Sequence, residues 1–149
     1  MTSYPVLLTL AVVAACAAAP PPASLDSVRQ EPNLEHRSSL ALEYALAMSD
    51  IAPKAYRDGK SAQLDNALKE VASGAELALE SLGKTGKVAR KSPKYFKRAE
   101  IATRQVIRRL DDLAESMNVD ERAAVAQARA RVAAVRDNLI EQLMARKPK

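Results

Sequence analysis

Aromatic residues are almost absent from this sequence. There is no Trp, Phe96 is the single Phe, and aromatics make up 3% of the 149 residues, whereas hydrophobic residues make up 48%. The apolar content argues against disorder throughout the chain. The core must therefore consist of Ala, Leu, Val, Ile and Met, and small side chains bury little area, which predicts modest stability. Glycine is also rare, at four residues, and such a composition favours helix.

Cysteine and histidine occur once each, as Cys16 and His36. One Cys excludes an intramolecular disulfide and a Cys-based metal site. His36 follows Glu35 near an expected helix start, where we expect a surface or capping role. The Glu-x-x-His pairs of di-metal bundles and the Cys-x-x-Cys-His of covalent haem are both absent. Residues 83–87 have the residue types of a phosphate loop but not its spacing. We therefore expect no enzyme, no metal and no cofactor.

The N-terminal segment has the features of an export signal. Residues 6–19 form an uncharged, mostly apolar run that ends in small residues before three prolines. The run is shorter than the ~20 residues of a transmembrane helix, so we expect a signal peptide over residues 1–19. Residues 13–16, Val-Ala-Ala-Cys, resemble a bacterial lipobox, which would make Cys16 the lipidation site. The alternative is cleavage after the Ala-x-Ala of residues 17–19. Both routes predict an exported protein, periplasmic or otherwise in the cell envelope, or secreted.

Residues 20–31 are predicted to form a Pro-rich linker, because tri-proline is stiff and extended. Residues 32–149 are then a single domain with four expected helices, over about 32–57, 61–82, 92–117 and 120–146. Similar lengths and short connections predict an all-α fold, an antiparallel up-down-up-down four-helix bundle. Pro53 predicts a kink or a short break in the first helix. A tetratricopeptide-like hairpin is the alternative, although no second copy of that 34-residue repeat is found.

Apolar residues recur at steps of three and four in each expected helix and define its buried stripe. The predicted stripes are Ala41, Ala45, Met48, Ala52 and Ala55; Leu64, Leu68, Val71, Ala75, Ala78 and Leu82; Phe96, Ala99, Thr103, Val106, Leu110, Leu113 and Met117; and Val125, Ala128, Val132, Val135, Leu139 and Leu143. Gly74 is expected to weaken the second helix mildly. Gly83 is predicted to cap that helix, and Ser92 and Asp120 are predicted to begin the next two.

Positive charge is concentrated in one segment. Residues 84–109 contain ten basic residues and one acid, Glu100, whereas the chain as a whole carries +5. The basic residues are Lys84, Lys87, Arg90, Lys91, Lys94, Lys97, Arg98, Arg104, Arg108 and Arg109. Five of them, Lys94, Lys97, Arg98, Arg104 and Arg108, are expected on the outward face of the third helix. One interpretation is a solvated helix face, and the other is a site for a polyanion such as lipid headgroups.

Three stretches carry a resemblance: residues 35–40, 92–100 and 108–113. They are similar to a group of uncharacterised small exported bacterial helical proteins. The resemblance implies export and a helical bundle, and it implies no activity.

Two functional hypotheses follow from the sequence. The first is a non-enzymatic binding or scaffold protein of the envelope or the secreted fraction, with another protein as partner. The second is an anionic-surface binder that uses residues 84–109. Export argues against nucleic acid as a partner, and membrane association is expected only through a lipidated Cys16 or the basic residues.

Overall fold

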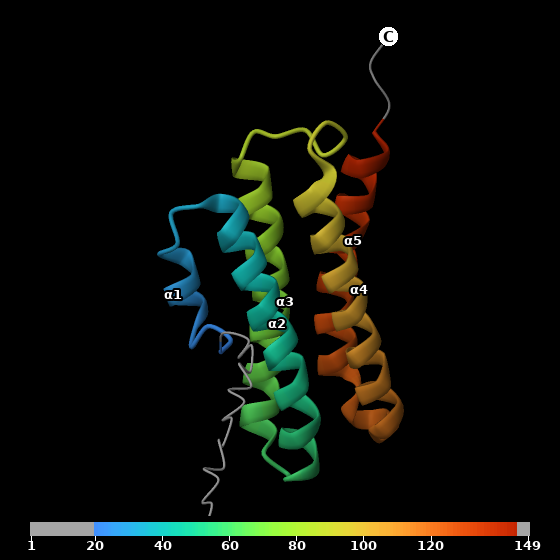
Figure 1. Cartoon of the computed structure of the whole chain (residues 1–149). Helices are drawn as coiled ribbons and strands as arrows, with labels where there is room; N and C mark the ends of the chain where they lie inside the picture. The colour runs from blue at the N-terminus through green and yellow to red at the C-terminus, as the bar shows by residue number, and fades with distance from the viewer. Residues whose placement is uncertain (1–19, 146–149) are drawn as a thin grey trace, which may run out of the picture.

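The structure is a computed structural model that describes residues 20–145, and within this range every regular element is helical (Figure 1). A short helix, α1 (Leu25–Arg29), precedes four long helices. These are α2 (Leu34–Arg57), α3 (Ser61–Lys84), α4 (Pro93–Ser116) and α5 (Ala123–Met144), with a 3-10 turn, η1 (Val119–Glu121), before α5. The predicted all-α, antiparallel up-down-up-down four-helix bundle is confirmed. The predicted signal peptide, Cys16 and the last four residues lie outside the described residues.

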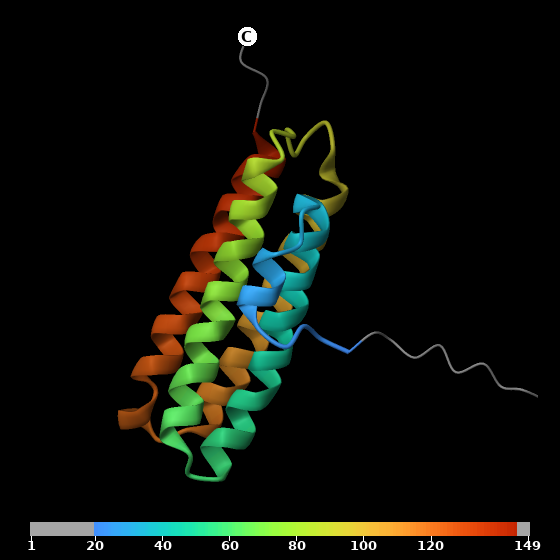
Figure 2. The same ribbon diagram turned by 90° about the vertical axis from the view of Figure 1, so that its left-hand side faces the viewer.

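The four helices form two hairpins that pack side by side. Helix α2 packs mainly on α3, and α4 on α5, while α2 also contacts α4 and α3 contacts α5. Figures 1 and 2 show that α3 and α4 therefore lie diagonally across the bundle, although they follow each other in the chain. The segment 85–92 crosses the end of the bundle to join them. This diagonal step places that segment over the helix ends, where most of its side chains, though not that of Ala89, are open to solvent.

The predicted stripes form the core. All six predicted positions in α3 are buried, as are the six in α4, Met117 directly after α4, and five of the six in α5. Phe96, the largest of the fully buried side chains, belongs to this cluster. Met48 and Leu143 are only partly buried and pack against the edge of the core. The regular spacing of three and four thus identifies the inward face of the long helices.

Helices α2 and α3 approach each other closely because small residues line their contact. A Cβ atom added at Gly74 would lie 2.9 Å from the Ala41 carbonyl oxygen and 3.0 Å from the Ala45 Cβ. The expectation of a mildly weakened helix therefore leaves out the packing role of Gly74. The glycine lets the backbones of the two helices come together where any side chain would force them apart.

The predicted linker is wrong over Leu25–Arg29, which form helix α1 against the bundle. Ser24 caps this helix by accepting a hydrogen bond from the Ser27 amide at 3.2 Å. Leu25 and Val28 are buried in the main core cluster. Two apolar side chains on one short turn thus dock the segment on α2, and they extend the folded domain towards the N-terminus.

Helix α2 continues through Pro53 without a break. Proline has no amide hydrogen and leaves the carbonyl four residues earlier without its usual donor. Close to this point, the Arg109 guanidinium from α4 donates to the Leu46 carbonyl at 2.9 Å and to the Ser49 hydroxyl at 3.2 Å. It also pairs with Asp50 at 2.9 Å. Arg109 therefore joins α4 to the turn of α2 that precedes Pro53.

Two predicted helix caps are wrong. Gly83 lies inside α3, and the glycine in the left-handed region after the helix is Gly86, at φ +67°. Asp120 lies within η1 rather than at the start of α5, which Arg122 precedes. Ser92 does precede α4, as predicted, but its side chain makes no capping hydrogen bond.

Candidate anion-binding surface

The ten predicted basic residues fall into two sets. Four are in ion pairs: Lys84 with Glu80, Lys87 with Glu35 at 2.6 Å, Arg104 with Glu100 at 2.6 Å, and Arg109 with Asp50 at 2.9 Å. The other six have no acidic partner within residues 20–145, and all six are exposed. They are Arg90, Lys91, Lys94, Lys97, Arg98 and Arg108. The sequence predicted an outward position for the four of these residues that lie on α4, and the structure separates the cations that are neutralised from those that are not.

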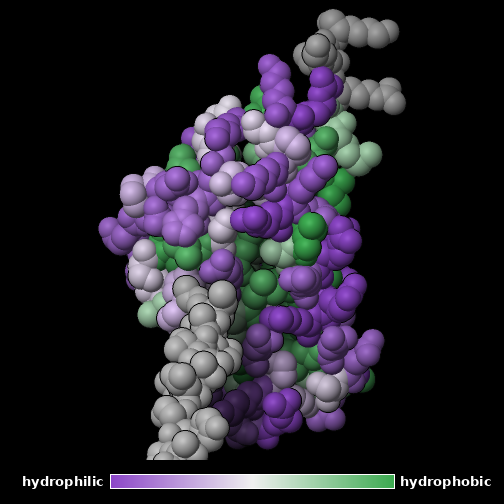
Figure 3. All heavy atoms as spheres, viewed as in Figure 1, coloured by the Kyte–Doolittle hydropathy of each residue, from purple (hydrophilic) through white to green (hydrophobic). Residues whose placement is uncertain are grey.

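Five of the six unpaired cations gather at one end of the bundle. Arg90 and Lys91 lie in the connection between α3 and α4, and Lys94, Lys97 and Arg98 occupy the first two turns of α4. We call these five residues the basic end. Figure 3 shows hydrophilic side chains over this part of the molecule. Arg108 is ten residues beyond Arg98, about 15 Å further along the helix axis, and does not belong to the group.

The basic end is electrostatically unfavourable for the helix that carries it. A helix N-terminus has a partial positive charge and favours acids, yet the first turn of α4 has no acidic residue. Lys94 also precedes Lys97 and Arg98 by three and four residues, spacings at which like charges cost about 0.2–0.5 kcal/mol per pair. Tyr95 offsets part of this cost, because its ring centroid lies 5.4 Å from the Lys94 amine and 5.9 Å from the Arg98 guanidinium. The result is a local excess of positive charge on this part of the surface.

The connection that carries Arg90 and Lys91 is held in place on the bundle. Ala89 is buried at 2% exposure in the core cluster. The Val88 carbonyl accepts hydrogen bonds from the amides of Lys91 at 2.9 Å and Ser92 at 3.0 Å. The ion pair between Lys87 and Glu35 ties the same segment to α2. These contacts fix the backbone from which the side chains of Arg90 and Lys91 project.

Arg104 is exposed as predicted but is engaged in a structural ion pair. The Glu100 carboxylate, on a residue that is 8% exposed, accepts hydrogen bonds from Arg104 at 2.6 and 3.2 Å and from Arg136 of α5 at 3.0 Å. Hydrogen bonds from Arg104, opposed by burial and supported by Arg136, hold the pKa of Glu100 below its ordinary value. The pair with Arg104 lies within α4, and the bond from Arg136 joins the same carboxylate to α5. The charge of Arg104 is therefore neutralised by Glu100, and Arg104 is not part of the basic end.

The Glu100 cluster leads to a prediction about stability and pH. Glu100→Gln is expected to lower the free energy of unfolding by about 2 kcal/mol at pH 7, the usual scale for hydrogen bonds to a charged group. Because the folded-state pKa is lowered, this contribution is present above pH 4.5, the ordinary value, and is lost as the pH falls through the folded pKa. Urea denaturation at a series of pH values should show the difference from wild type shrinking with acidification. Glu115→Gln, at an exposed position of the same helix, serves as the control, and a pH-independent difference would contradict the assignment.

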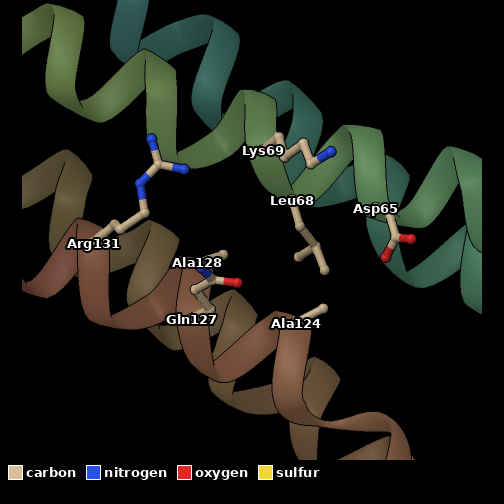
Figure 4. A pocket seen from close by; sticks show the side chains of 7 residues that line it. All are labelled: Asp65, Leu68, Lys69, Ala124, Gln127, Ala128 and Arg131. Atoms are coloured by element: carbon tan, nitrogen blue, oxygen red, sulfur yellow. The ribbon is translucent and has the colours of Figure 1, made fainter.

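Two hollows on the surface of residues 20–145 have neither histidine nor cysteine in their lining. The one in Figure 4 has a volume of about 310 Å³ and lies between α3 and α5, with Leu68 pointing towards α5 and Lys69 and Arg131 at its rim. Arg131 is paired with Glu76 at 2.7 Å. Another hollow, of about 250 Å³, lies at the far end of the bundle near Tyr56. Within the described part of the chain, no three His, Cys, Asp or Glu side chains are arranged to hold a metal ion.

His36 occupies the surface position predicted for it. Its amide donates to the Asn33 side chain at 2.9 Å in the first turn of α2, and its ring contacts Glu31 at 3.0 Å.

Among residues 20–145, no helix has an apolar stretch long enough to span a bilayer.

Comparison with known proteins found no match to this chain among protein families, curated proteins or solved structures.

Proposed function

We propose that this protein is a non-enzymatic binding protein that docks on an anionic, phosphate-bearing surface through its basic end. The observation that carries the proposal is the gathering of five exposed cations, none with an acidic partner in the described structure, on one ordered end of the bundle. Export through a signal over residues 1–19 is part of the proposal and rests on the sequence. An exported protein would meet such a surface in the cell envelope.

The remaining cations of residues 20–145 do not form a comparable surface. Lys54, Arg57 and Lys60 lie at the opposite end, where α2 turns into α3, and acidic residues alternate with them along the chain at Asp50, Asp58 and Asp65. Between Gly83 and Ile101 the only acid is Glu100, which is buried and already paired. Attraction for an anionic surface is therefore expected at the basic end and not at the opposite end.

The chain offers a matched pair of variants for testing this proposal. One replaces Lys91, Lys94, Lys97 and Arg98 with Gln. The control replaces Lys54, Arg57, Lys60 and Lys69 with Gln. It removes the same numbers of lysine and arginine, three and one, from exposed positions elsewhere. Both variants lower the formal net charge equally, and Gln retains helix propensity. The chain used begins at Pro20 and contains every helix of the described structure.

We expect the basic-end variant to lose binding to anionic vesicles and the control to retain it. Each cation near an anionic membrane contributes about 1 kcal/mol, so four should change the affinity by roughly 10²- to 10³-fold. Co-sedimentation with vesicles of phosphatidylglycerol and phosphatidylethanolamine measures the effect, with phosphatidylcholine vesicles and soluble inorganic polyphosphate as further arms. Equal retention of wild type and both variants in every arm would make the cations a solvated helix face and leave a protein-binding scaffold as the function.

A further inference from the structure

We propose that the anionic surface is a phospholipid bilayer, and that the bundle docks on it end-on with Val88 inserted between the headgroups. This inference rests on the proposed function and identifies its partner. Its starting point is Val88, an exposed apolar side chain that neither packs in the core nor carries charge.

Val88 is an exposed residue in the 85–92 connection, between Lys87 and Arg90 in the chain. Its residue is 56% exposed, whereas the adjacent Ala89 is 2% exposed. The buried Ala89 anchors the turn, and the hydrogen bond from the Lys91 amide to the Val88 carbonyl closes it at 2.9 Å. Val88 is thus presented on an ordered turn, next to Lys87 in the chain and one turn away from Lys91.

A second apolar side chain lies at the same end of the molecule. Met144, the last residue of α5, is 74% exposed. Figures 1 and 2 place the end of α5 beside the 85–92 connection. The other large apolar side chains exposed within residues 20–145 are Ile101, on the side of α4, and Val119, in η1 at the opposite end. The basic end therefore combines cations with apolar groups, and the opposite end has Val119 without a comparable cluster of cations.

A bilayer is the partner that satisfies both features. Cations attract anionic headgroups, and apolar side chains gain free energy by leaving water for the acyl boundary. A soluble polyanion would neutralise the cations but leave Val88 in water. A double-stranded nucleic acid would likewise leave Val88 in water. Single-stranded nucleic acid is usually held in part by stacking on aromatic side chains, and Tyr95 is half-buried and lies against Lys94 and Arg98. Glu31 and Glu35 on the α2 side of this end would be repelled by headgroups, so the contact should centre on the 85–92 connection and the start of α4.

A tryptophan at position 88 tests the insertion, because the natural sequence has no Trp. In Val88→Trp, the indole is expected to shift its emission to the blue on anionic vesicles and to be quenched by brominated acyl chains. Val119→Trp places the same reporter at the opposite end, where no shift and no quenching are expected. If Val88→Trp co-sediments with the vesicles but its emission stays that of a solvated indole, insertion is wrong and the proposed function stands. If the protein does not sediment with anionic vesicles, both proposals fail.

A second variant separates a bilayer from other polyanions without adding an aromatic group. Val88→Ser removes apolar surface but no charge, and its affinity for anionic vesicles should fall roughly 3- to 10-fold. Its affinity for soluble polyphosphate should match that of wild type. Val119→Ser should leave both affinities unchanged. Equal affinities of wild type and Val88→Ser for the vesicles would overturn the bilayer assignment.

Discussion

Replacing Leu110 with Asp is expected to unfold the protein at room temperature. Leu110 is 1% exposed in the stripe of α4 that faces the core. A carboxylate at this position would be buried without a partner, and a buried unpaired charge costs about 3–5 kcal/mol or more. Because a core of small side chains supports modest stability, this cost is comparable to the whole free energy of folding. Circular dichroism should show a large loss of helix and no cooperative thermal transition.

The control for this variant is Ile101→Asp, which places the same charge on an exposed position of the same helix. Ile101 is 52% exposed, so the charge stays in water and the melting temperature should change by only a few degrees. A Leu110→Asp protein that melts like Ile101→Asp would show that the inward face of α4 is wrongly assigned.

Gly74→Leu is expected to cause the second large loss of stability. The first atom of any side chain at this position would lie 2.9 Å from a backbone oxygen of α2, and that oxygen can move only if the whole helix moves. Overpacking of this kind costs about 1–3 kcal/mol, and a leucine adds three further carbon atoms to the clash. We therefore expect a loss of roughly 3 kcal/mol or more in the free energy of unfolding, measured by urea denaturation.

Gly83→Leu is the matched control, since Gly83 lies in the same helix and a Cβ there would meet nothing within 4 Å. Leucine has the higher helix propensity, so this variant should be as stable as wild type or more stable by about 0.5–1 kcal/mol. Both substitutions replace glycine with leucine, but only position 74 lies against a neighbouring helix. Similar stabilities for the two variants would mean that α2 and α3 do not approach each other closely at Gly74.

The long helices could be predicted from the sequence because each repeats its apolar positions over several turns. In α4, the stripe that runs from Phe96 to Met117 is buried at every predicted position. Helix α1 could not be predicted in this way, since its five residues contain too few turns for a periodicity and follow three prolines. The diagonal placement of α3 and α4 also leaves no periodic signal, because it depends on which hairpin faces pack together.

The candidate site was predicted only in part. Exposure of the basic residues follows from helical spacing, and two ion pairs, Lys84 with Glu80 and Arg104 with Glu100, join residues four apart and can be seen in the sequence. The partners of Lys87 and Arg109 come from α2 and depend on the tertiary fold. These pairs determine which cations remain available for a ligand.

Val88 had no signal in the sequence that distinguished it from its neighbour. Val88 and Ala89 are adjacent apolar residues in a basic connection, and either could face the core. The structure buries the smaller of the two and exposes the larger. Valine usually gains more from burial than alanine, so the exposure of Val88 is unusual. This exposure is the observation behind the proposed contact with a bilayer.

The salt dependence of binding to anionic vesicles is the most direct test of the basic end as a docking surface. Wild type and the control quadruple variant should bind tightly at low ionic strength and lose affinity steeply as salt is added, because screening acts over about 10 Å at 0.1 M. The variant that lacks Lys91, Lys94, Lys97 and Arg98 should bind weakly at low salt and respond little to added salt. Binding of all three proteins with the same affinity and the same salt response would contradict the assignment of this surface as the site of docking.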